Sequence, residues 1–303
     1  MKTILGVKSN DTYLNILISY AYAGKSKGFN DLVVNESLKG NVNVMIDSGA
    51  FTIYNSKTIS KLNLDSYCEY LEHNAHKVEK YVMLDVVKDE AKTKSNYQTM
   101  LKRGFNPMFV FTEYDKDWSY VKEAVQNQKH LCVAGGVTNR GDWMLKRYQD
   151  VYLKTQADIH ALGFVQYNDI FRVPLHSVDS SSWVQASQVY GIISYFDNGI
   201  KGIAHRDILQ RKKKIPLKLK MILEKLKITP KEFSDLENHK GSKSIATIIN
   251  TMAYIEYQKY AKRLGLNLFL AIANSLQANQ ILYINEHLCN DTLIYDNYKK
   301  VKL

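Results

Sequence analysis

The sequence predicts an α/β protein, a TIM-like (β/α)8 barrel with a helical, basic C-terminal extension. In the first 200 residues, short apolar runs alternate with helical patterns. Near-continuous apolar strands that alternate with helices are typical of a parallel sheet covered on both faces. The length of 303 residues fits one barrel of roughly 250 residues plus an extension.

Eight apolar runs are the predicted strands. In chain order they are residues 3–7, 42–46, 81–87, 107–112, 130–137, 158–165, 173–178 and 191–196. Up to eight such strands favour a barrel, and a doubly wound open sheet is the competing arrangement.

Helical patterns separate these strands and then replace them. Residues 64–76 and 118–125 carry apolar side chains at helical spacing between predicted strands. After about residue 205 the strand-like runs stop, and helices are expected over residues 211–228, 245–264 and 266–287. We therefore expect a barrel domain over residues 1–204. Residues 205–303 are expected to form a helical basic region that packs on the barrel and contacts nucleic acid.

The positive charge is concentrated in one segment. The formal net charge is +11, and residues 201–243 hold thirteen Lys or Arg against five acidic residues. Such a field favours a polyanionic partner, with a membrane surface or a merely solvated basic helix as alternatives. The candidate phosphate contacts are Arg206, Arg211, Lys212, Lys213, Lys214, Lys218 and Lys220.

Cysteine usage and the apolar stretches favour a cytoplasmic protein. The three cysteines are far apart, and no Cys-x-x-Cys pair is present. Residues 14–24 are too short and too polar a stretch to span a bilayer. No membrane partner is expected.

Several chemically active residues stand where predicted parallel strands end. These are Asp47 with Ser48-Gly49, Asp85, Gly135-Gly136 and Asp179. An Asx turn explains Asp47 alone and a helix cap explains Asp179 alone, whereas Asp85 interrupts an apolar run and needs a partner. The carboxyl ends of parallel strands meet at one edge of the sheet, so the combination indicates a site.

The residues 47–51, Asp-Ser-Gly-Ala-Phe, resemble the Asp-Ser-Gly-Gly-Phe motif of tRNA-guanine transglycosylases. Further matches follow in that family's order at Leu84-Asp85, Ala134-Gly135-Gly136, His160-Ala161-Leu162-Gly163 and Val178-Asp179. The likeness is closer to the phage and bacterial branch that inserts 7-deazaguanine bases into DNA (DpdA-like). In that branch Ala50, the Leu64–Tyr67 segment and the Ser177–Trp183 segment also fit. The resemblance covers roughly residues 1–200.

This resemblance implies a β/α barrel and a base-exchange reaction in DNA. Asp179 would be the nucleophile at C1′, Asp47 the general acid and base, and Asp85 the acceptor for the purine N1–H and exocyclic amine. Asp47 then needs a pKa raised relative to that of Asp179. The other implied base contacts are Ser48, Phe51, Gly135, Gly136, His160 and Gly163, although a histidine in an apolar run is more often a core residue.

The expected partners are DNA and a free 7-deazaguanine base such as preQ0 or a relative. The zinc motif of the tRNA enzymes has no counterpart beyond residue 183, so no metal or other cofactor is expected. Three alternatives stay open: the same exchange on tRNA, a non-catalytic nucleic-acid-binding barrel, and a sugar glycosidase of barrel type.

Overall fold

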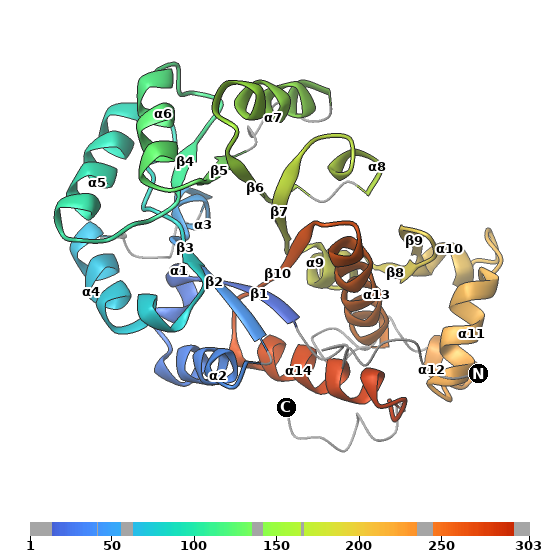
Figure 1. Ribbon diagram of the computed structural model, residues 1–303. Helices are drawn as coiled ribbons and strands as arrows, with labels where there is room; N and C mark the ends of the chain where they lie inside the picture. The colour runs from blue at the N-terminus through green and yellow to red at the C-terminus, as the bar shows by residue number, and fades with distance from the viewer. Residues whose placement is uncertain are drawn as a thin grey trace, which may run out of the picture.

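A curled, eight-stranded parallel sheet flanked by helices organises the molecule (Figure 1). The computed structural model describes residues 14–40, 42–55, 63–134, 142–164, 167–234 and 245–293. The strands are β1 (Leu14–Ser19), β2 (Val42–Asp47), β3 (Lys80–Tyr81), β4 (Phe109–Phe111), β5 (His130–Ala134), β6 (Asp158–Leu162), β7 (Leu175–Ser180), β8 (Ile192–Phe196), β9 (Ile200–Ala204) and β10 (Asn267–Ile272).

The parallel sheet has the order β3-β2-β1-β10-β7-β6-β5-β4. Its two edge strands approach each other at a parallel bridge between Val82, just after β3, and Met108, just before β4. There the Met108 N–H donates to the Tyr81 carbonyl (2.9 Å) and the Met83 N–H to the Met108 carbonyl (3.0 Å). This one bridge does not make a ladder. The TIM-like prediction is therefore confirmed as a curled parallel α/β sheet, and not as a closed barrel.

The helices follow most of the strands and cover the sheet (Figure 1). They are α1 (Tyr20–Ala23), α2 (Lys27–Leu38), α3 (Ala50–Asn55), α4 (Leu64–Asn74) with the 3-10 turn η1 (Ala75–Lys77), α5 (Glu90–Lys102), α6 (Trp118–Asn127), α7 (Asp142–Thr155), α8 (Tyr167–Ile170), α9 (Ser182–Gln188), α10 (His205–Leu209), α11 (Leu217–Lys225), α12 (Pro230–Ser234), α13 (Ile245–Arg263) and α14 (Ser275–Cys289). The helices expected over 64–76, 118–125 and 245–264 are confirmed as α4, α6 and α13.

One predicted strand joins a different sheet, one predicted helix is wrong at its start, and one predicted strand falls outside the described residues. Residues 191–196 do form a strand, β8, but it pairs antiparallel with β9 and lies outside the parallel sheet. The helix expected over 266–287 is wrong at its start, because β10 occupies Asn267–Ile272 and only α14 is helical. The strand expected over 3–7 lies outside the described residues, and β1 was not predicted as a strand.

The sheet continues beyond residue 204, the expected end of the barrel domain. Strand β10 is inserted between β1 and β7, so a segment near the C-terminus supplies an interior strand. The remainder of the expected extension is helical in its described part, although α11 begins only at Leu217. Pro216 stands just before α11, and a proline tends to end a preceding helix because it lacks an N–H and restricts its neighbour.

A buried glutamine joins β10 to β1 at the start of both strands. Gln258 of α13 accepts from the Asn15 N–H (3.0 Å) and donates to the carbonyls of Asn15 (2.8 Å) and Leu268 (2.7 Å). Its amide therefore satisfies backbone groups of both strands, which buried strands require. This contact fixes the C-terminal helix and strand to the N-terminal half of the sheet.

Replacing Gln258 with leucine is expected to destabilise the fold by about 3 kcal/mol, because the backbone groups of Asn15 and Leu268 lose their partner while buried. The free energy of unfolding from urea titration measures this. Gln185→Leu is the matched control: it removes an exposed amide that bonds Ser181, and about 0.5 kcal/mol or less is expected. Equal effects of the two substitutions would contradict the stabilising role given to Gln258.

Candidate active site

The three aspartates singled out in the sequence lie at one edge of the parallel sheet. Asp47 is the last residue of β2, Asp85 follows β3, and Asp179 is the fifth residue of β7. Their charges act on one another, since Asp179 raises the pKa of Asp47 and Asp47 raises the pKa of Asp85. All three also raise the pKa of the buried Cys132 thiol on β5, after the larger effect of burial. The structure thus brings the three carboxyl groups together.

A tight turn fixes the Asp47 carboxyl group. The Gly49 N–H donates to Asp47 Oδ2 (2.8 Å), and helix α3 begins at the next residue. Gly49 has a φ of +82°, and a Cβ there would lie 2.5 Å from Ser19 Oγ and 2.6 Å from Ala21 Cβ. A side chain at this position is therefore excluded both by backbone conformation and by space. The glycine of the Asp-Ser-Gly sequence is needed for the geometry of the turn.

The Asp85 carboxyl group is held from two sides. The buried Ser48 hydroxyl donates a hydrogen bond to it, which links the turn after β2 to the segment after β3. Helix α5 fixes the same segment, because Asn96 donates to the Leu84 carbonyl (2.9 Å) and Thr93 Oγ1 accepts from the Val86 N–H (2.9 Å). Ser48 was expected to contact a base, and in the structure its hydroxyl group is hydrogen-bonded to Asp85.

Asp179 has a supporting network behind it. Its Oδ1 accepts from the Gly163 N–H (2.8 Å) and lies 3.3 Å from His160 Nε2. His160 Nδ1 is in turn 2.8 Å from the Ser177 hydroxyl. With Ser177 donating to Nδ1, the Nε2–H of His160 faces Asp179. Among the described residues Oδ2 makes no hydrogen bond, so one carboxylate oxygen is held while the other is available.

This network gives His160 and Gly163 different surroundings from those expected. His160 is only 1% exposed, which places it against Asp179 and away from solvent. The Gly163 N–H, expected to contact a base, is directed at Asp179 Oδ1. Both residues are therefore placed to orient the carboxyl group.

Burial and like charge both oppose ionisation of the carboxyl groups in this site. Burial, followed by repulsion from Asp179, raises the pKa of Asp47 to about 6. Burial, followed by repulsion from Asp47, raises the pKa of Asp85 to about 7. Both residues keep some exposed surface, so they remain reachable while poorly hydrated. A carboxyl group with a pKa near 6 can donate a proton near neutral pH, as the acid assigned to Asp47 must.

Of the remaining candidate base contacts, the structure describes Phe51 alone. Phe51 lies in α3 with 60% of its surface exposed. Gly135 and Gly136 lie outside the described residues.

The basic candidates occupy a separate part of the molecule. Helices α10, α11 and α12 lie together beside β8 and β9, on the opposite flank from β3 and β4 (Figure 1). All seven candidate side chains are exposed: Arg206, Arg211, Lys212, Lys213, Lys214, Lys218 and Lys220. Two of them form ion pairs within the described residues, with Lys213 3.0 Å from Asp207 and Lys220 3.8 Å from Glu224.

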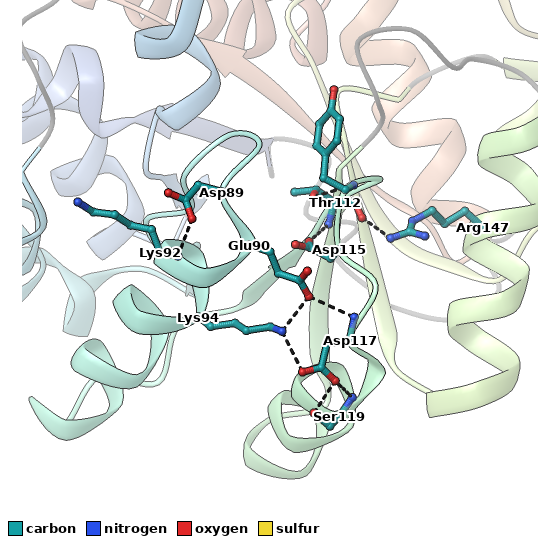
Figure 2. Close-up of polar contacts among 10 residues, drawn as sticks. Asp89, Glu90, Lys92, Lys94, Thr112, Asp115, Asp117, Ser119 and Arg147 are labelled. Atoms are coloured by element: carbon teal, nitrogen blue, oxygen red, sulfur yellow. Dashed lines mark hydrogen bonds and ion pairs between the residues drawn. The ribbon is translucent and has the colours of Figure 1, made fainter.

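A polar network after β4 was not predicted from the sequence (Figure 2). The buried Asp115 accepts from the Thr112 N–H, and Arg147 of α7 donates to the Thr112 carbonyl. Burial raises the pKa of Asp115, whose charge in turn raises that of Asp85. The signal was available, because Thr112 ends a predicted strand and Asp115 stands three residues beyond it.

A second group of polar contacts, also drawn in Figure 2, holds the segment after β4 in place. Lys94 of α5 contacts Glu90 (2.8 Å) and Asp117 (2.9 Å), and Glu90 accepts from the Asp117 N–H (3.1 Å). Asp117 also caps α6 through the Ser119 N–H (2.9 Å). The segment after β4 is therefore tied to the helices on both sides of it.

Comparison of the chain with models of known protein families and with curated proteins finds no match. Within the ranges the structure covers, no three His, Cys, Asp or Glu side chains are grouped so as to hold a metal ion. In those same ranges no helix has both the length and the apolar character needed to cross a membrane.

Proposed function

We propose that the protein exchanges guanine in DNA for a 7-deazaguanine derivative through a covalent Asp179–glycosyl intermediate. The observation that carries the proposal is the coupled set of Asp47, Asp85 and Asp179 at one sheet edge, with Asp179 oriented by Gly163. Replacing one base by another with retention at C1′ needs a nucleophile and a separate acid and base. Two of these carboxyl groups supply those functions, and the third recognises the purine.

The first half of the reaction forms the intermediate. Asp179 Oδ2 attacks C1′ of the target nucleotide, and the C1′–N9 bond breaks with its electron pair moving to guanine. The Asp47 carboxyl group donates its proton to the departing base, for which a pKa of about 6 is suitable. The sugar is then held as an ester of Asp179, and neutral guanine leaves.

The second half reverses these steps with the incoming base. The Asp47 carboxylate takes the N9 proton of the 7-deazaguanine, N9 attacks C1′, and the bond to Asp179 breaks. Asp85 accepts hydrogen bonds from the purine N1–H and exocyclic amine, two adjacent donors that suit a carboxylate. These donors offset the burial that raises the pKa of Asp85 in the free protein. The target base must leave its stack or be unpaired to reach the site.

Incubating the full chain with radiolabelled guanine and either single-stranded DNA, duplex DNA or tRNA tests the proposal. We expect label in DNA, and we expect a protein–DNA adduct to be trapped when no incoming base is supplied. Peptide mapping should place the adduct on Asp179. Exchange on tRNA alone would transfer the chemistry to another substrate, and no exchange on any nucleic acid would overturn the proposal.

A further inference from the structure

Exposed aromatic side chains follow the strands that end at the candidate active site. Helix α3 starts three residues after Asp47 and carries Phe51, 60% exposed, and Tyr54, 49% exposed. Large aromatic groups are costly to leave in water, and where they cluster they often mark an interaction surface. Because α3 follows Asp47 so closely in the chain, these side chains are suited to contact a bound substrate.

A lysine is fixed between two of these aromatic rings. Lys88 follows Asp85 by three residues, and its Nζ lies 5.6 Å from the centre of the Tyr54 ring and 5.8 Å from that of Tyr114. It also hydrogen-bonds to Tyr54, and the negative charge of Glu113 acts on it as well. Its φ of +67° is unusual for a residue other than glycine. Such backbone conformations concentrate at functional positions.

The same alternation of aromatic and cationic groups continues along the sheet edge. Tyr54 follows β2, Lys88 follows β3, and Tyr114 follows β4. Helix α7, which follows β5, adds the partly exposed Trp143 with the Arg147 guanidinium 5.7 Å from its ring. These strands are consecutive around the curled sheet, because β2 pairs with β3, β3 is bridged to β4, and β4 pairs with β5.

We propose that this aromatic rim, defined as Phe51, Tyr54, Lys88, Tyr114, Trp143 and Arg147, binds the nucleotides that flank the target in an unpaired stretch of nucleic acid. The inference rests on the proposed function, in which one base enters the site while its neighbours stay outside. Aromatic faces stack on bases of any sequence, and Lys or Arg beside them contacts phosphates. A duplex would keep its base faces covered, so the rim suits an unpaired strand.

Fluorescence anisotropy with a labelled single-stranded DNA oligonucleotide, in the absence of any incoming base, tests the rim. We expect Tyr54→Ala and Lys88→Gln each to weaken binding about tenfold. Matched controls are Tyr190→Ala, an exposed tyrosine beyond α9, and Lys39→Gln, an exposed lysine before β2 at the opposite sheet edge. The controls should bind as the wild type does, and thermal melts should show all four variants folded.

A second arm uses heparin, a polyanion without bases, to separate stacking from charge. Tyr54→Ala should leave heparin binding unchanged. Equal affinity of the rim variants and the wild type for single-stranded DNA, or no binding by the wild type, overturns the rim. Binding that depends on the rim, without base exchange, would support the rim proposal and overturn the proposed reaction. Base exchange that does not depend on the rim would support the reaction and overturn the rim proposal.

Discussion

Asp179→Asn is expected to reduce base exchange on DNA by at least about 10³-fold, because an amide oxygen cannot form the glycosyl ester on which the reaction depends. The fold should be retained, since asparagine matches aspartate in shape and its Oδ1 can still accept from the Gly163 N–H. The measurement is the initial rate of guanine incorporation, with mass spectrometry of the protein after incubation with DNA alone.

The control is Asp65→Asn, which removes a largely exposed carboxyl group on α4 that pairs with Arg103. This variant should exchange bases and form the adduct as the wild type does. Turnover by Asp179→Asn near the wild-type rate, with an adduct of unchanged mass, would mean that another group attacks C1′. In that case the Asp179 carboxyl group, which is oriented by Gly163, His160 and Ser177, would have a role other than attack on C1′.

The sequence allowed the strand-end aspartates to be found, but not the support behind them. Asp47 and Asp85 follow apolar runs whose partners lie close in the chain, so their common edge follows from parallel pairing. The contacts of Asp179 with Gly163 and His160 depend on β6 and β7 lying side by side with an irregular register, which no local pattern specifies. Of the proposed rim only Phe51 was predicted as a base contact, because the rim residues come from four separate loops and helices.

The same limit explains the errors in the fold. Strand β10 is a short apolar run beside helical patterns, and periodicity alone does not separate such a strand from a buried helix. Gly265, with a φ of +84°, ends the preceding helix and was the one local signal. Strand β8 was predicted correctly as a strand, but an apolar pattern does not say which sheet a strand will join.

Asp47→Asn is expected to stabilise the protein near pH 8 while it removes the acid of the reaction. In the wild type the pKa values of Asp47 and Asp85 are about 6 and about 7 in the folded state, above the ordinary value of 3.8. Between about pH 4 and about pH 7 these two carboxyl groups therefore bind more protons in the folded chain than in the unfolded chain, and their contribution to the stability falls as the pH rises. Asparagine cannot ionise, so in the variant this position no longer lowers the free energy of unfolding as the pH rises.

The expected gain at about pH 8 is on the order of 2–3 kcal/mol in the free energy of unfolding, and it should vanish at about pH 4. The asparagine introduced by Asp47→Asn would still accept from the Gly49 N–H, so the turn should persist. The exchange rate should fall about 10²–10⁴-fold, the range for losing a general acid. Urea titrations of wild type, Asp47→Asn and Asp65→Asn at both pH values measure the stabilities. A variant less stable than the wild type at pH 8 would show that the Asp47 carboxylate stabilises the fold. A group retained for its chemistry is expected to do the opposite and to reduce the stability of the folded protein.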